Sequence, residues 1–306
     1  MTKNKENILI AGGTGFIGTN LCKSLSKTKF NVFSCSTKRP DKFNKLLGVK
    51  YIKCDLSQKK QIEKRLSRNF DYIVNLSGYV DHSNAKKVRL THYEGCKNLA
   101  NFFKKKKIKK FIQFGSSVEY GFSKSPQSEK YILPSKDLKS YYGKAKNNST
   151  KYLLKLNKNE NFPVIIFRLY LAYGPRQNTK RLIPFIIKKS LKNEKFPCSN
   201  GNQVRDFLFV EDLIKLIKLS LKKDVCGVYN LGSGKPIKIK SIIKKIIKII
   251  GAGKPDFGKI KLRSDEPLIL FPNIKKIKKH FNWKPKMNID QGLKKTINFY
   301  KNELFR

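Results

Sequence analysis

Short apolar runs alternate with segments of helical periodicity along the first half of the chain. The apolar runs have the length and the Val, Ile and Phe content of buried strands, and they lie at 8–11, 31–35, 51–56, 72–78 and 110–114. The segments that read as helices between and after them lie at 16–25, about 58–66, 84–106 and 140–156. Strands and helices that alternate at this spacing predict an α/β fold with a doubly wound parallel sheet.

A glycine-rich turn, Gly12-Gly13-Thr14-Gly15-Phe16-Ile17-Gly18, joins the first strand to the first helix. In such a turn the first glycine allows the tight bend, the second lets the backbone approach a pyrophosphate, and the third brings the helix close to the strand. The unpaired N–H groups at the helix start favour an anion. A glycine loop that only redirects the chain is the alternative, but strand, turn and helix follow in the required order. We therefore expect a dinucleotide to bind at Gly12, Gly15, Phe16, Ile17 and Gly18.

The end of the second strand indicates which dinucleotide. An NAD site usually has a carboxylate there, which binds the ribose 2′-hydroxyl. This chain has Ser36, Lys38 and Arg39 instead, a hydroxyl and two cations that suit a 2′-phosphate. The alternative is that Lys38 and Arg39 are ordinary surface cations of a lysine-rich chain. We favour NADP(H) over NAD.

Candidate catalytic residues follow the fifth strand. Ser116 lies just after its end, and Tyr142 and Lys146 are four residues apart on the next predicted helix, so that both project from one face. A tyrosine hydroxyl is too weak an acid to exchange protons efficiently at neutral pH, and a nearby ammonium stabilises the phenolate. The Y-x-x-x-K spacing alone is common by chance. Its position after the fifth strand of a dinucleotide fold gives it weight.

The chain carries 68 Lys and Arg against 21 Asp and Glu, a formal net charge of +47. A polyanion partner such as nucleic acid is one interpretation, and a biased composition is the other. The lysines are spread over the whole chain without a recognised nucleic-acid motif, so we do not expect nucleic acid as a partner. We do expect the charge to attract phosphate-bearing substrates.

Other functional classes are disfavoured by absences in the sequence. No apolar run approaches the length of a membrane span, and no secretory segment precedes the first strand. The six cysteines are scattered without a C-x-x-C pair or a nearby histidine. We expect a cytoplasmic protein with reduced thiols, no membrane partner and no metal site.

With these motifs the chain resembles the extended short-chain dehydrogenase/reductase family, in its branch of nucleotide-sugar epimerases, dehydratases and reductases. The similarity covers nearly the whole length. It rests on the glycine turn, Asp55-Leu56, Ser116 four residues before Tyr120-Gly121, Tyr142-x-x-x-Lys146, Arg168-x-x-x-x-Tyr173-Gly174-Pro175, Arg205-Asp206-Phe207, Asn230-Leu231-Gly232-Ser233-Gly234 and Trp283-x-Pro285.

The resemblance implies a role for each matching residue. Tyr142 would be the acid/base, Lys146 would bind the nicotinamide ribose and tune the tyrosine, and Ser116 would hydrogen-bond the reacting oxygen. Asp55 and Leu56 would frame the adenine.

Further cofactor and substrate contacts are expected on other segments. Leu76 and Gly78 lie where the fourth strand ends in small residues and a cofactor could approach. Arg205 and Arg263 resemble the family's ligands for the substrate diphosphate, a role that suits the planar guanidinium. Ser117 is expected to contact the substrate.

Three departures from the family pattern bear on the reaction. The 4,6-dehydratases carry Asp-Glu after the catalytic hydroxyl residue, but this chain has Ser117 and Val118, and valine cannot move a proton. Dehydration is therefore disfavoured. Leu171 stands where the family commonly has an Asn that contacts the diphosphate. His92 stands where an Asn often supports the active-site helix, and the sequence leaves open whether this histidine is functional.

The resemblance also implies the domain organisation. A Rossmann-type dinucleotide-binding domain is expected over 1–175, with 205–234 returning to it. A smaller substrate-binding lobe would comprise 176–204 and 235–306, including a core-facing amphipathic helix over 237–250. The helices near 84–106 and 140–157 correspond to those that pair family members, so we expect a homodimer.

We conclude that the sequence predicts an NADP(H)-dependent reductase of a nucleotide-linked 4-keto-6-deoxy sugar. A 4-epimerase that retains NAD is the alternative, because it uses the same Ser, Tyr and Lys. A 4,6-dehydratase and a noncatalytic nucleotide- or RNA-binding protein are disfavoured. The nucleotide, the sugar and the product stereochemistry stay open.

Overall fold

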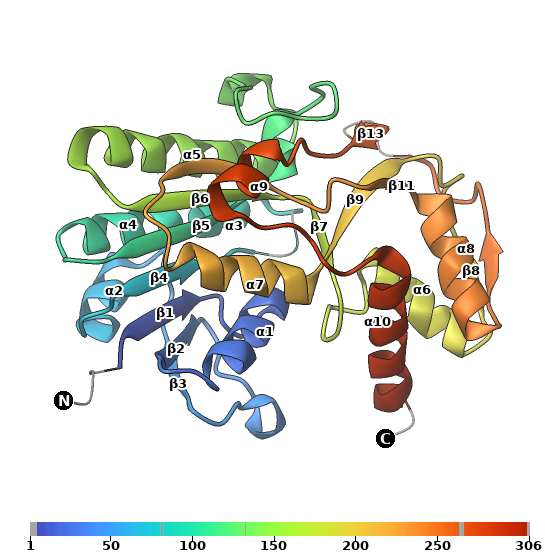
Figure 1. Cartoon of the computed structure of the whole chain (residues 1–306), viewed down its shortest axis with the longest axis horizontal. Helices are drawn as coiled ribbons and strands as arrows, with labels where there is room; N and C mark the ends of the chain where they lie inside the picture. The colour runs from blue at the N-terminus through green and yellow to red at the C-terminus, as the bar shows by residue number, and fades with distance from the viewer. Residues whose placement is uncertain (1–4, 80, 82, 132, 263–265, 305–306) are drawn as a thin grey trace. The chain divides into compact units, whose positions relative to one another are not determined.

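The structure is a computed structural model that describes residues 5–79, 81, 83–131, 133–262 and 266–304 (Figure 1). The chain divides into two compact units. The first comprises Met1–Gly121, Ile132–Arg168 and Ile217–Tyr229, and the second comprises Phe122–Tyr131, Leu169–Leu216 and Asn230–Arg306. Three elements, β6, α7 and β10, include residues assigned to each unit.

A seven-stranded parallel sheet organises the first unit, in the order β10-β6-β5-β4-β1-β2-β3. Its strands are β1 (Asn7–Ala11), β2 (Asn31–Ser36), β3 (Val49–Lys53), β4 (Tyr72–Asn75), β5 (Lys110–Ser116), β6 (Val164–Leu169) and β10 (Gly227–Leu231). The strand order reverses between β1 and β4, which pair directly, and the carboxyl ends at such a reversal form the usual ligand crevice of open α/β sheets. The predicted α/β fold with a doubly wound sheet is confirmed.

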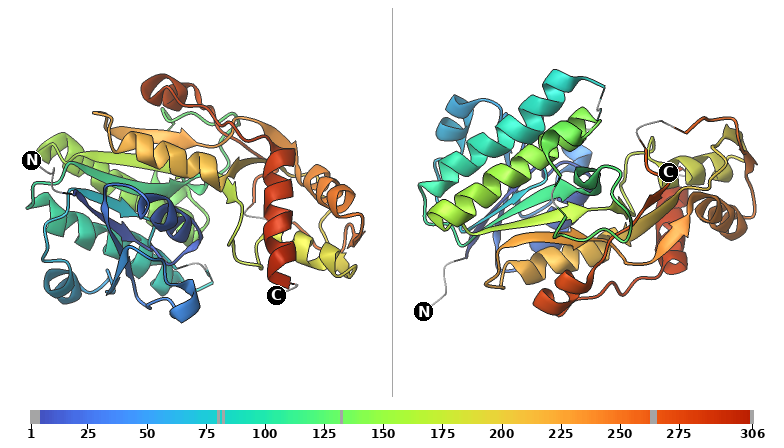
Figure 2. Two further views of the ribbon diagram at one scale, coloured as in Figure 1. Left: turned by 60° about the horizontal axis from the view of Figure 1, so that its bottom comes forward. Right: turned by 90° about the horizontal axis from the view of Figure 1, so that it is seen from above.

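Helices cover the sheet because both of its faces are apolar. The helices of the first unit are α1 (Phe16–Leu25), α2 (Lys59–Arg65), α3 (Ala85–Val88), α4 (Gly95–Lys104) and α5 (Tyr141–Glu160). One core cluster joins side chains of α2, α4 and α5 to the same face of the sheet. The right view of Figure 2 shows α4 and α5 side by side along the sheet. On the other face Ile8, Ile10 and Val74 are also fully buried, which explains the near-continuous apolar runs.

Several element boundaries differ from the expected ones, and three of the differences bear on the site. The third strand begins at Val49 and ends at Lys53, so Asp55 and Leu56 lie in the turn beyond it. The fifth strand continues through Ser116. The helix expected over 84–106 is interrupted by a π-helical segment, Arg89–Glu94, between α3 and α4. A π-helical turn contains one extra residue per turn and is frequent at functional sites.

The second unit contains two small sheets and several helices. One sheet has the order β11-β9-β13 with β7 also paired to β9, and the other pairs β12 with β8. The bounds are β7 (Leu171–Tyr173), α6 (Leu182–Leu191), β8 (Lys195–Pro197), β9 (Val204–Phe209), α7 (Val210–Ser220), β11 (Pro236–Lys238), α8 (Ile239–Ile250), β12 (Lys254–Asp256), β13 (Ile269–Leu270), α9 (Lys275–Phe281) and α10 (Ile289–Leu304). The isoleucines of α8 pack in one core with α6 and α10, so the helix expected over 237–250 does face a core.

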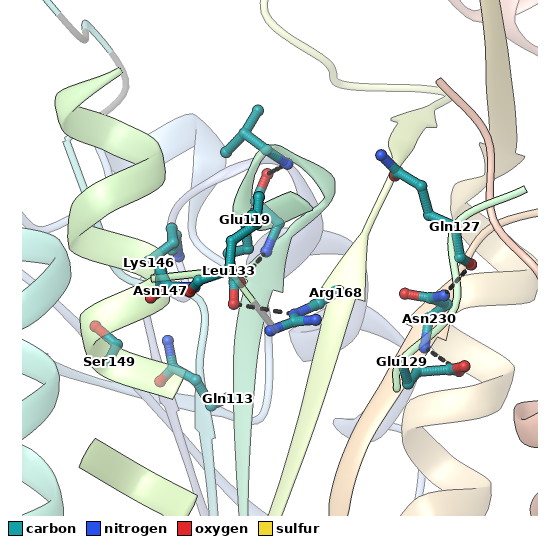
Figure 3. Close-up of polar contacts among 12 residues, drawn as sticks. Gln113, Glu119, Gln127, Glu129, Leu133, Lys146, Asn147, Ser149, Arg168 and Asn230 are labelled. Atoms are coloured by element: carbon teal, nitrogen blue, oxygen red, sulfur yellow. Dashed lines mark hydrogen bonds and ion pairs between the residues drawn. The ribbon is translucent and has the colours of Figure 1, made fainter. Parts of the chain in front are cut away.

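A network of buried hydrogen bonds holds the segment 122–131 in the second unit. Asn230 donates from Nδ2 to the Gln127 carbonyl at 2.8 Å, and its backbone N–H donates to Glu129 Oε1 at 2.8 Å (Figure 3). The Tyr170 hydroxyl donates to Gln127 Oε1 at 2.7 Å. Because these polar groups are satisfied by one another, the segment has a defined place in the second unit.

Candidate active site

The glycine turn has the close packing that its sequence predicts. Gly12 has φ +77°, and a Cβ there would lie 2.8 Å from the Leu76 carbonyl carbon. A Cβ on Gly18 would lie 2.6 Å from the Gly13 Cα, so the third glycine lets α1 approach the turn. Around Gly15, by contrast, the nearest atom to an added Cβ is the Gly12 carbonyl at 3.3 Å. The turn is therefore closed toward the sheet and open at Gly15.

The start of α1 is suited to an anion. Gly15 is its N-cap, and in the described part of the chain no side chain caps this helix and no acidic residue lies in its first turn. Its first N–H groups are left for a ligand, and the helix dipole favours negative charge there. The residues present thus fit the pyrophosphate of a nicotinamide dinucleotide, with Phe16 and Ile17 supplying the first helical N–H groups.

The residues expected to choose between NADP and NAD follow β2 beside this turn. The Thr14 hydroxyl donates to Ser36 Oγ at 2.9 Å, which ties the glycine turn to the end of β2. Lys38 and Arg39 are exposed. Exposed cations at this place can reach a phosphate on the ribose, but their exposure equally suits ordinary surface residues.

The residues expected to frame the adenine lie beyond the end of β3, and Leu76, another expected cofactor contact, follows β4. Asp55 accepts from the Ser57 N–H and hydroxyl through Oδ1, at 2.9 and 2.8 Å, which orders the turn after β3. Leu56 is buried, and its carbonyl accepts from Asn98 Nδ2 at 3.1 Å. Leu76 donates its N–H to the Ala11 carbonyl at 2.8 Å. These bonds place the turns after β3 and β4 along the carboxyl edge of the sheet.

Tyr142 and Lys146 lie together near the start of α5. Ser140 caps this helix by accepting from the Gly143 N–H at 3.0 Å. The Lys146 ammonium lies 5.8 Å from the centre of the Tyr142 ring and donates to the Phe114 carbonyl at 2.6 Å. Lys146 is almost fully buried, whereas Tyr142 is partly exposed. A buried cation beside a partly exposed phenol is an arrangement that supports proton transfer to a ligand.

His92 belongs to this group, a point that the sequence left open. Its ring centre lies 4.9 Å from that of Tyr142 in an edge-to-face arrangement, and its Nε2 donates to the Tyr79 carbonyl at 3.0 Å. A Cβ on Gly78 would overlap the imidazole, so Gly78 is required where the ring packs. The π-helical segment that carries His92 is held by the Ser149 hydroxyl, which donates to the His92 carbonyl at 2.7 Å.

Ser116 is anchored at the end of β5 by Glu119, which the sequence analysis did not single out. Its N–H donates to Glu119 Oε1 at 2.8 Å, and its hydroxyl accepts from the Val118 N–H at 3.4 Å. Glu119 Oε2 is paired with Arg168 Nε at 3.0 Å (Figure 3). Ser117 is buried in the short helical turn Ser117–Tyr120. The Ser-x-x-Glu spacing of a capping box was readable in the sequence, but the partner on β6 was not.

Of the two arginines expected to bind the substrate diphosphate, only Arg205 lies within the described residues. Arg205, on β9, is almost fully buried and donates through its NH1 nitrogen to the Val204 and Leu268 carbonyls, at 2.8 and 3.1 Å. Its NH2 nitrogen lies 2.5 Å from Glu266 Oε1, so this guanidinium is already paired with a carboxylate. Arg263 lies outside the described residues.

The described ranges contain neither a metal-binding cluster nor a helix suited to span a membrane. No cluster of three or more His, Cys, Asp or Glu side chains there has the arrangement needed to hold a metal ion. None of the helices in those ranges combines the length and the apolar character that a membrane span requires.

Known proteins resemble this chain over most of its length. The pattern of the NAD dependent epimerase/dehydratase family matches residues 8–232. The chain is 27% identical to a putative UDP-glucose 4-epimerase of Methanocaldococcus jannaschii, over 96% of this chain and 98% of that one. It is 26% identical to CDP-abequose synthase of Salmonella muenchen, over 95% and 97%. The similarity to dTDP-D-glucose 4,6-dehydratase of Dictyostelium discoideum, at 28% identity over 80% of this chain, spans 62% of that protein.

Solved structures share the fold over the whole chain. A UDP-glucose 4-epimerase of Thermotoga maritima with UDP-glucose superposes with a TM-score of 0.91 at 23% identity, over 97% of this chain and 99% of that one. A dTDP-glucose 4,6-dehydratase of Bacillus anthracis in complex with NAD superposes with a TM-score of 0.84 at 25% identity, over 97% of each chain.

Proposed function

The chain belongs to the NAD dependent epimerase/dehydratase family, whose members are NAD-dependent enzymes, and on that premise we propose that it is a reductase of a nucleotide-linked 4-keto-6-deoxy sugar that uses NADP(H). The observation that carries the proposal is the group of Tyr142, Lys146 and His92 in the same unit as the open glycine turn. A dinucleotide site and a proton-transfer group in one unit are the requirements of hydride transfer coupled to protonation.

Each of these residues has a specific role in the proposed reduction. Gly12 to Gly18 and the start of α1 would hold the cofactor, which when bound supplies the hydride. Tyr142 gives a proton to the sugar oxygen as the carbonyl is reduced. The Lys146 ammonium stabilises the phenolate that remains, and the Ser116 hydroxyl holds the reacting oxygen. Val118 offers no proton, which separates this reaction from a dehydration.

The substrate class follows from what the relatives share. Their names refer to UDP-, CDP- and dTDP-linked sugars, so the diphosphate-linked sugar is common to them and the base is not. Arg205 is the described residue best suited to the diphosphate, because a guanidinium binds phosphate oxygens in pairs. An arriving diphosphate would have to replace Glu266 on this arginine.

A 4-epimerase that retains NAD is the second candidate. The similarity to a putative UDP-glucose 4-epimerase extends over nearly the full length of both chains, which favours it. The same Ser116, Tyr142 and Lys146 could remove and return hydrogen at one ring carbon. The two candidates differ in whether the cofactor is consumed.

One screen tests the proposal and separates the candidates. Purified enzyme is mixed with NADPH or NADH and with UDP-, dTDP-, GDP- and CDP-linked sugars, including 4-keto-6-deoxy forms. The absorbance of the reduced nicotinamide is followed, and the sugars are analysed by chromatography. The reductase oxidises one equivalent of NADPH for each sugar reduced. Epimeric products without a net change in nicotinamide support the epimerase, and no conversion of any sugar overturns both.

The choice of cofactor has a separate test with a matched control. If Lys38 and Arg39 contact a 2′-phosphate, Arg39→Ala should weaken NADPH about tenfold and leave NADH unchanged, as for one lost charged hydrogen bond. Lys64→Ala, which removes an exposed cation from α2, should change neither affinity. Equal binding of NADPH and NADH that Arg39→Ala does not alter contradicts the preference for NADP.

A further inference from the structure

We infer that Glu119 is a positioning residue for Ser116, and that Arg168 holds Glu119 in place to make it so. The inference rests on the proposed function, because it takes Ser116 as the residue that holds the reacting oxygen. It adds two residues, one on the turn after β5 and one on β6, to the machinery of that site.

The two carboxylate oxygens of Glu119 have different partners, the Ser116 backbone and the Arg168 side chain. Oε1 accepts the Ser116 N–H at 2.8 Å, and Oε2 is 3.0 Å from Arg168 Nε. Both side chains are buried, with 0% of Glu119 and 3% of Arg168 exposed. Since both side chains are enclosed by the protein, these two contacts hold the carboxylate in a fixed position.

Contacts with Tyr120 and Glu119 hold the Arg168 guanidinium in place. Its guanidinium carbon lies 4.5 Å from the centre of the Tyr120 ring, so the cation is stacked as well as paired. Burial acts to lower the pKa of Arg168, but Glu119 and Tyr120 together hold that pKa above its usual value. A charge that stays fixed and paired gives Glu119 one stable orientation.

The bond from the Ser116 N–H to Glu119 fixes the backbone from which the Ser116 hydroxyl projects. That hydroxyl accepts from the Val118 N–H at 3.4 Å, so its own proton is available to a ligand. There is no room for a side chain at Gly115, where an added Cβ would collide with Glu119 Oε1. The carboxylate therefore packs directly under the strand end that presents Ser116.

The same strand end is held from a second side by the catalytic lysine. Lys146 donates to the Phe114 carbonyl, two residues before Ser116, at 2.6 Å. Figure 3 shows Glu119 and Lys146 near the end of β5. A shift of Ser116 would thus change its geometry relative to Lys146, and small misplacements of catalytic groups lower the rate strongly.

The alternative is that the ion pair only stabilises the core. A single substitution cannot decide this, because it leaves one buried charge unpaired and the variant may unfold. Two neutral double variants avoid the problem. Glu119→Gln with Arg168→Met keeps an oxygen that can accept from the Ser116 N–H. Glu119→Leu with Arg168→Met has similar volume and no acceptor.

The expected result is a difference in kcat between the two variants at equal stability. With the nucleotide sugar that is converted fastest in the screen above, the Leu variant should lose about 10- to 100-fold in kcat with KM little changed, since one fixed hydrogen bond is lost. The Gln variant should recover most of that loss. Equal kcat in two variants of matched melting temperature overturns the inference.

A double-mutant cycle separates this inference from the proposed function. In a Ser116→Ala background, the exchange of Gln for Leu at position 119 should have no further effect, because Glu119 acts through Ser116. If Ser116→Ala itself leaves turnover unchanged, the proposed role of Ser116 fails. If Ser116→Ala is impaired and the effects simply multiply, the inference about Glu119 fails and the proposed function stands.

A measurement without substrate completes the test. Hydrogen exchange followed by mass spectrometry reports the protection of amides in the segment 111–121. The Ser116 amide should exchange at least tenfold faster in the Leu variant than in the Gln variant, because it has lost its acceptor. Equal protection in both variants contradicts the inference whatever the activity is.

Discussion

Two buried arginines of this chain are each paired with a glutamate, but the two glutamates differ in their access to water. In the first unit Glu119 is 0% exposed and bonded to the Ser116 backbone as well as to Arg168. In the second unit Glu266 is 30% exposed and lies against Arg205. A fully enclosed carboxylate is difficult to exchange, whereas a partly solvated one can give way to another anion. The first pair therefore suits positioning, and the second suits ligand exchange.

The largest difference between the pairs should appear in stability. Arg168→Met leaves the Glu119 charge buried without its partner, and we expect a loss of about 3–5 kcal/mol in the free energy of unfolding. Arg205→Met leaves Glu266 accessible to water, so the free energy of unfolding should fall by only about 1–2 kcal/mol. Most of that fall should come from the Val204 and Leu268 carbonyls, which lose their donor. Urea unfolding of both variants measures this. Equal losses contradict the distinction.

A smaller effect is expected on substrate binding, and only at the second pair. Arg205→Met should raise KM for the nucleotide sugar about 10- to 100-fold, the effect of one lost charge-assisted contact, with cofactor affinity unchanged. Saturation kinetics and cofactor titration give the two quantities. An unaltered KM means that Arg205 does not bind the diphosphate.

The exchange of anions at Arg205 can be probed directly. Glu266→Gln removes the competing charge, so KM should fall about two- to fivefold, in keeping with a partly solvated ion pair. Glu211→Gln serves as the control, because Glu211 is a glutamate of the same unit whose pair with Lys295 is exposed. A rise in KM for Glu266→Gln would show that the pair is needed to orient Arg205.

The smallest effect is the contribution of Asp206, which follows Arg205 in β9, to the pH dependence of the free energy of unfolding. Asp206 accepts from the Ser233 and Lys235 N–H groups, yet burial raises its pKa above the usual 3.8. The folded state then holds the proton more tightly than the unfolded chain, so this group's contribution to stability falls as the pH rises through its folded pKa. In urea unfolding across this acid range, Asp206→Asn should remove that slope. An identical slope in the variant shows that Asp206 is not its source.

What the sequence could and could not predict follows from how local each feature is. The glycine turn and the Tyr142–Lys146 spacing are set within a few residues, so their local geometry was readable. The pair of Glu119 with Arg168 joins positions 49 residues apart, and it exists because β5 and β6 are neighbours in the sheet. No local pattern reports such a contact.

His92 illustrates the same limit within one helix. The apolar periodicity of 84–106 indicates a continuous helix, but a π-helical segment carries His92 to the ring of Tyr142. The imidazole fits there because Gly78, beyond the end of β4, has no Cβ that would overlap it. His92 departs from the family pattern in the sequence, but only the packing places its ring beside Tyr142.

The central claim is that Tyr142 exchanges a proton while hydride passes between a nicotinamide and a sugar carbon. The most direct measurement compares wild type and Tyr142→Phe in a single turnover with the best nucleotide sugar of the screen, following the nicotinamide absorbance. Tyr142→Phe should lose about 100- to 10,000-fold in the rate of that change, with cofactor and nucleotide-sugar affinities kept. A Tyr142→Phe enzyme that turns over at the wild-type rate would contradict it.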